Sequence, residues 1–188
     1  MVHPVSAPAL RYPLSLRVLH WSRAVLILGL IACGWFMTGR AEDDAVAAWL
    51  YPNHKQFGLL VWLLAMVHLV VRWRERVRLP REAHELRPWE RKLSMATQRL
   101  MIALTLLTPM FGYAMSSVFT QSDGVPFFVV SRLPEFLPKN DALFPLFQTL
   151  HRYSAYILLT CVALHVAGAL KHRVLHAGSE RDVLTRML

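Results

Sequence analysis

Residues 151–170 read HRYSAYILLTCVALHVAGAL, and this stretch decides the fold. Between Arg152 and Lys171 lie 18 residues without a charge. At a rise of about 1.5 Å per residue, a helix of this length approaches the roughly 30 Å thickness of a bilayer's hydrocarbon core. The stretch therefore predicts a transmembrane helix that carries a histidine near each end.

Three further uncharged runs, over residues 24–39, 56–71 and 100–122, resemble it in length and hydropathy. The two shorter runs span a bilayer if their helices begin earlier, near Leu16 and Pro52, with polar ends among neighbouring helices or headgroups. We expect helices over about residues 16–38, 53–72, 95–120 and 148–171. They predict an all-α, integral-membrane four-helix bundle in which residues 1–188 form one domain. Pro109 lies inside the third helix and predicts a kink there.

The composition supports a membrane protein. Of the 188 residues, 55% are hydrophobic and 18% are charged, where soluble proteins carry about 25% charged residues. The net charge of +9 does not predict nucleic-acid binding, because the basic residues flank the apolar runs. Cys33 and Cys161 form neither a CxxC pair nor a CxxCH haem-attachment motif, and we interpret them as packing residues.

The distribution of basic residues predicts the orientation. Sixteen of the 21 Lys and Arg residues lie before residue 24, between Arg72 and Arg99, or after residue 170. By the positive-inside rule, both termini and the middle connection are cytoplasmic. A cleavable signal peptide is the competing interpretation of the first forty residues, but His20 and Arg23 interrupt the apolar stretch and no clear cleavage site follows. The residues from Gln121 to Leu146, rich in proline, predict a structured external loop.

Five of the nine histidines lie within or beside the predicted helices: His20, His54, His68, His151 and His165. An ionisable side chain in a bilayer is costly and is a functional candidate by default. His151 and His165 are fourteen residues apart, about 21 Å along one helix face. His151 should lie level with His54, and His165 level with His20.

Two level-matched histidine pairs predict two haems stacked across the membrane, each held between facing helices. Bis-imidazole ligation fills both axial positions of the iron, so the expected work is one-electron transfer. His68 lies fourteen residues after His54, and by geometry alone it is an alternative to His20 as the partner of His165. Two other interpretations are structural histidines between helices and a zinc site, although zinc prefers four converging ligands.

Further residues are expected around such haems. Gly58, one turn beyond His54, would let a flat macrocycle approach the backbone. Cationic side chains are placed to meet either haem propionates or lipid phosphates: Arg17, Arg23, Lys55, Arg72 and Arg152. Tryptophans are expected in an interfacial belt: Trp21, Trp35, Trp49, Trp62 and Trp73. The default for the remaining histidines is exposure: His3, His84, His172 and His176.

The chain resembles the bacterial cytochrome b561 family over nearly its whole length. The resemblance rests on four segments: SLRVLHWSRAVLILGLIACGWFM around His20, YPNHKQFGLLVWLLAMVHLVVRWR around His54, LTLLTPMFGYAMSS in the third helix, and the final helix with its ALKH and DVLTRML motifs. The HW motif, the H-x-x-x-G motif, and the spacing of His151 and His165 with the ALKH and DVLTRML motifs are weak singly and specific together.

This resemblance implies an inner-membrane cytochrome b with two haem b groups that exchanges electrons with the ubiquinone pool. Mapped by motif, His20 and His165 would ligate the cytoplasmic haem iron, and His54 and His151 the periplasmic one. The mapping favours His20 over His68, which stands at a level where relatives typically have an arginine. That departure leaves open how the cytoplasmic haem's surroundings are built.

One branch of the family is similar to a superoxide oxidase, which implies superoxide as a donor; a periplasmic redox protein is the alternative donor. Basic residues near the outer haem would attract the anion: Lys55, Arg132, Lys139 and Arg152. Arg40 lies on the same face and brings its cations to five. Six acidic residues offset them to a net charge of minus one: Glu42, Asp43, Asp44, Asp123, Glu135 and Asp141. Steering is therefore expected only from a local pocket.

Two alternative functions remain. The chain could anchor a larger dehydrogenase or hydrogenase as its cytochrome b subunit, which would require a large subunit docked on modest external loops. It could also be a metal-ion transporter that uses intramembrane histidines. A transporter would bind metal without a Soret band and would prefer acidic residues in the spans, which this sequence lacks.

Overall fold

The computed structural model describes residues 11–41, 43–77, 87–128, 130–175, 182 and 184–188. Four long helices account for most of them: α1 (Leu14–Thr38), α2 (Ala45–Arg74), α3 (Pro88–Val118) and α4 (Phe144–Leu175). Each is long and apolar enough to cross a membrane. The prediction of an all-α four-helix membrane bundle is confirmed.

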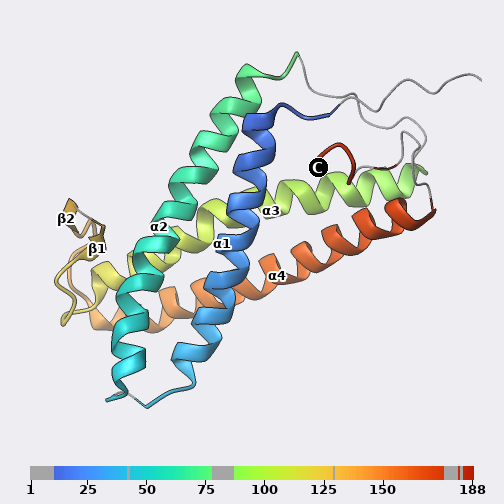
Figure 1. Cartoon of the computed structure of the whole chain (residues 1–188). Helices are drawn as coiled ribbons and strands as arrows, with labels where there is room; N and C mark the ends of the chain where they lie inside the picture. The colour runs from blue at the N-terminus through green and yellow to red at the C-terminus, as the bar shows by residue number, and fades with distance from the viewer. Residues whose placement is uncertain (1–10, 42, 78–86, 129, 176–181, 183) are drawn as a thin grey trace, which may run out of the picture.

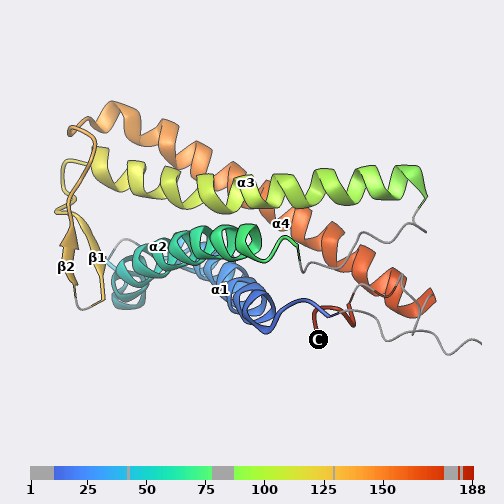
Figure 2. The same cartoon turned by 90° about the horizontal axis from the view of Figure 1, so that it is seen from above.

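The helices form two layers. α1 packs chiefly on α2, and α3 packs chiefly on α4, so that one helix pair lies across the other (Figures 1 and 2). The two pairs come together where α2 crosses the last turns of α3 and the first turns of α4, and they spread apart toward the first turns of α1 and the last turns of α4 (Figure 1). We call the first region the hairpin end and the second the terminal end.

Helix α3 is the most buried of the four: 39% of its most apolar 18-residue stretch is buried. Small polar side chains make up much of its buried surface, including Thr97, Thr105, Thr108, Ser116 and Ser117. Small residues let membrane helices approach closely, and their hydroxyls can bond across the interface. This explains how α3 packs tightly without a run of large side chains.

All four helices are longer than the sequence predicted, α1 by two residues and the other three by more. α2 begins at Ala45 rather than near residue 53, because Asp44 accepts hydrogen bonds from the N–H groups of Val46 and Ala47 and so caps the helix. Pro52 therefore lies inside α2 and does not start it. α3 begins at Pro88 rather than 95, and α4 runs over Phe144–Leu175 rather than 148–171. The first and last turns of a membrane helix can carry charges because they lie outside the hydrocarbon. A search for uncharged runs therefore misses these turns.

The connection between α3 and α4 contains a small hairpin within the expected external loop. β1 (Val125–Phe127) pairs antiparallel with β2 (Val130–Leu133), and a short 3-10 helix, η1 (Asp141–Leu143), leads into α4. Gly124 has φ +102°, a left-handed conformation that glycine adopts readily. The hairpin packs on α2 through an edge contact of the Phe57 and Phe128 rings and a bond from the Phe128 N–H to the Gln56 side chain.

Candidate functional site

A pair of histidines lies at the hairpin end, between the two layers. His54 of α2 and His151 of α4 face each other with ring centroids 6.1 Å apart and an interplanar angle of 81°. Both side chains are partly buried. The sequence placed His54 at the start of its helix, whereas α2 begins nine residues earlier. The two rings are nonetheless at one level, as predicted.

A second pair lies at the terminal end. His20 of α1 and His165 of α4 have ring centroids 6.3 Å apart and an interplanar angle of 61°. Each pair therefore joins one helix of the α1–α2 layer to α4 of the other layer. The two pairs share α4, on which their histidines are fourteen residues apart.

The separation within each pair fits one metal ion bound between two imidazoles. Metal–imidazole bonds of about 2 Å, with ~1 Å from each nitrogen to its ring centre, give centroids about 6 Å apart. Imidazole is a suitable ligand for iron. Within the described part of the chain, no three His, Cys, Asp or Glu residues converge as a metal site. The donor sets thus fit the two axial positions of a haem iron, with the remaining ligands supplied by the macrocycle.

The His151 ring is oriented by α3. Its Nδ1 lies 2.8 Å from the carbonyl oxygen of Thr108. A carbonyl only accepts hydrogen bonds, so Nδ1 carries the proton and the Nε2 lone pair is left for a metal. Such a bond to the second nitrogen is the usual support of a ligating histidine. The Thr108 hydroxyl also donates to Ser154, whose hydroxyl donates to the His151 carbonyl.

Two glycines give the rings of the hairpin-end pair their space. A Cβ at Gly112 of α3 would lie 3.0 Å from His151 Nδ1 and 3.1 Å from its Cε1. A Cβ at Gly34 of α1 would lie 3.5 Å from His54 Cε1, an ordinary contact distance. The distances at Gly112 are tighter than ordinary contact, so the His151 ring would have to shift to admit a Cβ there. The sequence analysis assigned no site role to Gly112 or to Gly34.

Open space borders the histidine faces elsewhere. A Cβ added at Gly58, one turn beyond His54, would meet no heavy atom within 4 Å, and the same holds at Gly168, three residues beyond His165. His54 Nδ1 is buried and has no hydrogen-bond partner. A buried polar atom without a partner is costly and calls for an unseen group or water. These features fit a flat group beside the rings.

His68 belongs to neither facing pair. It lies in α2, and His20, Arg23 and Arg72 interact with it electrostatically. Its Nδ1 is buried without a hydrogen-bond partner. Of the two alternatives left by the sequence for the position opposite His165, the geometry brings His20 there.

The cationic candidates divide into two groups. Arg17 and Arg23 are partly buried on α1, and the Nε atom of each is buried without a hydrogen-bond partner. Arg72 and Arg152 are exposed. Lys55 is partly buried and donates to the Ser116 hydroxyl across the layers at 3.0 Å. Of the four remaining histidines, His172 is partly buried in α4, and His3, His84 and His176 lie outside the described residues.

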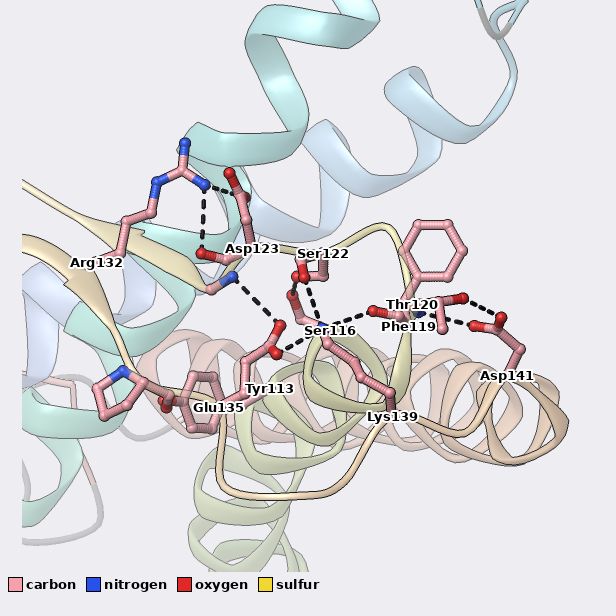
Figure 3. A network of polar contacts seen from close by, with 12 residues as sticks. Tyr113, Ser116, Phe119, Thr120, Ser122, Asp123, Arg132, Glu135, Lys139 and Asp141 are labelled. Carbon is pink, nitrogen blue, oxygen red and sulfur yellow. Dashed lines mark hydrogen bonds and ion pairs between the residues drawn. The ribbon is translucent and has the colours of Figure 1, made fainter.

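A polar network surrounds the last turn of α3 at the hairpin end (Figure 3). Lys139 donates to the carbonyls of Phe119 and Ser122 and pairs with Glu135 at 2.5 Å. The hydrogen bond from Lys139 holds the pKa of Glu135 below its ordinary value. Arg132 forms an ion pair with Asp123. Arg132 and Lys139, two of the cations expected to steer an anion, are therefore neutralised by neighbouring carboxylates. Of the acidic residues expected on this face, Glu42 lies outside the described residues.

Comparison with known proteins agrees with this geometry. The family described as prokaryotic cytochrome b561 matches residues 11–188. The chain is also 27% identical over 182 residues to "Cytochrome b561 homolog 2" of Escherichia coli (strain K12), a match that covers 95% of this chain and 91% of the relative. With four membrane-spanning helices and a family match over nearly its full length, the chain belongs to the prokaryotic cytochrome b561 family: it is a multi-pass membrane cytochrome of the haem b type that works in electron transfer.

Proposed function

We propose that this chain binds two haem b groups and moves single electrons across the bacterial inner membrane. One iron would be held between His54 and His151, and the other between His20 and His165. The observation that carries the proposal is the pair of ring separations, 6.1 Å and 6.3 Å, at opposite ends of the bundle. A haem iron held between two imidazoles would supply reversible one-electron transfer.

The protein's contribution is to bind and orient the groups and to set their environment. The Thr108 carbonyl fixes the His151 tautomer, and Gly112 leaves room for its ring. Lipid-facing apolar helices keep water from the histidines, which lowers the local dielectric and so influences the redox potential. Arg17 and Arg23, whose buried Nε atoms lack partners, are suited to bind propionate carboxylates.

The proposed orientation of the chain in the membrane follows from the distribution of its basic residues. The terminal end carries most of the basic residues, so we place it in the cytoplasm and the hairpin end in the periplasm. The His54–His151 haem would then meet a periplasmic partner, and the His20–His165 haem would exchange electrons with ubiquinone. The ubiquinone assignment rests on the family resemblance.

Superoxide is our proposed periplasmic partner, with a redox protein as the alternative. Lys55 follows His54 directly and lies in the partly buried interior of the hairpin end. Its ammonium group bonds to a neutral hydroxyl, whereas Arg132 and Lys139 are paired with carboxylates. Lys55 is therefore the residue best placed to attract a small anion locally.

The test is the dithionite-reduced minus oxidised spectrum of the detergent-purified protein, with haem measured per chain. We expect two b haems in the wild type. His54→Ala and His151→Ala should lose one and the same haem, and His20→Ala and His165→Ala the other. His68→Ala is the matched control, an intramembrane histidine outside both pairs, and should keep both.

Three results would contradict the proposal. Folded protein without haem would exclude any cytochrome role for these residues. If His68→Ala lost the haem held by His165 while His20→Ala kept it, His68 and not His20 would be the second ligand of that haem. Copurification of a large redox subunit from native membranes would instead favour the anchor-subunit function over direct exchange with superoxide.

A further inference from the structure

The last residues of the chain form a compact turn anchored on Asp182. The Asp182 side chain is 1% exposed and accepts hydrogen bonds from Arg173 Nη1 and from the Thr185 hydroxyl, both at 2.6 Å. Arg173 also donates to the Thr185 hydroxyl at 3.1 Å. The N–H groups of Met187 and Leu188 close the turn on the Leu184 carbonyl. A partly buried, charge-assisted set of bonds thus fixes the turn to the last turns of α4.

The opposite side of this turn is bound to α1. The Arg186 carbonyl accepts from the Tyr12 N–H at 3.0 Å, just before α1 begins. The Met187 carbonyl accepts from the indole N–H of Trp21 at 2.9 Å. In both views the C-terminus lies between the terminal ends of α1 and α4 (Figures 1 and 2). We call Asp182 and residues 184–188 the C-terminal strap.

The strap holds together two helices that belong to different layers. α1 packs chiefly on α2 and α4 on α3, and the layers spread apart at the terminal end (Figure 1). At the hairpin end, the layers are joined by the Lys55–Ser116 bond and by the hairpin packed on α2. At the terminal end, the strap bridges the layers: it bonds to Arg173 of α4 on one side and to Trp21 of α1 on the other.

The same contacts reach the His20–His165 pair. Trp21, whose indole N–H is held by the strap, is adjacent to His20, and the two rings meet edge to face with centroids 5.4 Å apart. His20 is on α1 and His165 on α4, so their separation depends on the distance between these helices. A shift of α1 away from α4 would carry His20 away from His165 while leaving the hairpin-end pair in place.

We infer that the C-terminal strap sets the separation of His20 and His165, with Asp182 as the positioning residue that anchors it. The inference rests on the proposed ligation of a haem iron by this pair. Asp182 acts through Arg173, Thr185 and Trp21 and does not itself contact the haem. Loss of its charge should release the strap and loosen one haem site of the two.

The first experiment compares full-length wild type, Asp182→Asn and Asp182→Glu in detergent. For Asp182→Asn we expect partial loss of one haem per chain, together with a shifted midpoint potential and an altered low-spin electron paramagnetic resonance signal for that haem alone. The other haem should keep its potential and signal. Asp182→Glu retains the carboxylate and should restore both. Asp43→Asn, the same change at an exposed aspartate of the α1–α2 turn, should alter neither haem.

The second experiment does not depend on haem. Spin labels at Ser15 of α1 and Val174 of α4, both exposed, are placed in a background with Cys33 and Cys161 replaced by alanine. The distance distribution between the labels should be narrow in wild type and broader and longer in Asp182→Asn. Thr185→Val removes the two hydroxyl bonds of the cluster, keeps the Arg173–Asp182 pair, and should broaden the distribution less. This variant keeps the test available if Asp182→Asn folds poorly.

The outcomes separate the two proposals. Wild type with fewer than two haems contradicts the proposed function, and the spin-label distances then still show whether the strap holds α1 to α4. Wild type with two haems, accompanied by unchanged potentials and unchanged distances in Asp182→Asn, overturns the inference about the strap. Equal changes at both haems would overturn it too, because the strap would then act on overall stability.

Discussion

His151 of α4 and Thr108 of α3 are joined by a hydrogen bond of 2.8 Å from imidazole Nδ1 to the backbone carbonyl. The residues are 43 positions apart in the sequence. The bond orients one of the four proposed ligands from a helix that contributes no histidine of its own. Helix α3 therefore acts as the support of the hairpin-end site as well as the most buried helix of the bundle.

Gly112→Ala should disturb the His151 ring. The new Cβ would lie 3.0 Å from His151 Nδ1, closer than ordinary van der Waals contact, so the ring must move or its bond to Thr108 must lengthen. We expect loss of the hairpin-end haem with retention of the other, measured by haem per chain and by redox titration. Gly29→Ala is the control, because Gly29 has open space around it and lies nine residues from His20, on the opposite face of α1. Equal haem loss in both variants would contradict this prediction.

Gly58→Ala tests whether a flat group lies beside His54. A Cβ at Gly58 meets no protein atom within 4 Å, and alanine raises helix propensity by about 1 kcal/mol over glycine. The haem-free protein should therefore be at least as stable as wild type, while haem retention at the hairpin-end site should fall. Thermal unfolding of haem-free protein and haem titration provide the two measurements. Unchanged haem affinity would show that nothing approaches the backbone at this position.

The hydroxyls of Thr108 and Ser154 should be coupled energetically. Their bond of 3.0 Å is buried between α3 and α4, and hydrogen bonds between membrane helices average about 0.6 kcal/mol in double-mutant cycles. We expect a coupling of this size between Thr108→Val and Ser154→Ala, measured by equilibrium unfolding in mixed micelles. A coupling near zero would mean that each hydroxyl finds another partner when its own is removed.

Lys55→Gln should slow the reduction of the protein by superoxide. The removed charge lies beside His54, and attraction of a small anion depends on such local charge. We expect a lower second-order rate and a weaker dependence on ionic strength, followed by stopped-flow absorbance of the reduced haems. Arg40→Gln removes one charge from the same end of the bundle, where Arg40 is paired with Asp44, and serves as control. Equal rates for wild type and Lys55→Gln would exclude steering by Lys55.

Asp44 should make stability depend on pH. Hydrogen bonds from the Ala47 and Val46 N–H groups, with the nearby Arg40, hold the pKa of this carboxyl below its ordinary value. Its contribution is therefore complete above the unfolded-state pKa of about 3.9 and is lost as pH falls through the lower folded-state pKa. Asp44→Asn keeps a capping side chain but cannot titrate. Thermal melts of haem-free protein should show wild type more stable than Asp44→Asn at neutral pH, with the difference shrinking in acid; a pH-independent difference would contradict the prediction.

Much of the fold could be read directly from the sequence, because hydropathy and helical periodicity are local properties. The runs around residues 24–39 and 153–170 mark spans whatever the rest of the chain does. The fourteen-residue spacing of His151 and His165 fixes their shared face on α4, since a helix repeats every 3.6 residues. The helix ends were less predictable. The start of α2 depends on the hydrogen bonds that Asp44 accepts, and Pro52 lies inside the helix as a result. A run of uncharged residues does not show where such a cap will form.

The candidate site divides in the same way. The sequence predicts which histidines lie within the spans and at which levels, because the level follows from position along a helix. The facing of His20 and His165, the place that Gly112 and Thr108 leave for His151, and the bond of Asp182 to Arg173 of α4 emerge from the packing of the helices. Such contacts join residues that are far apart in the sequence: Thr108 and His151 by 43 positions, and Trp21 and Met187 by 166. The rotation and crossing of whole helices set them. A one-dimensional pattern constrains each helix face but leaves open which faces meet.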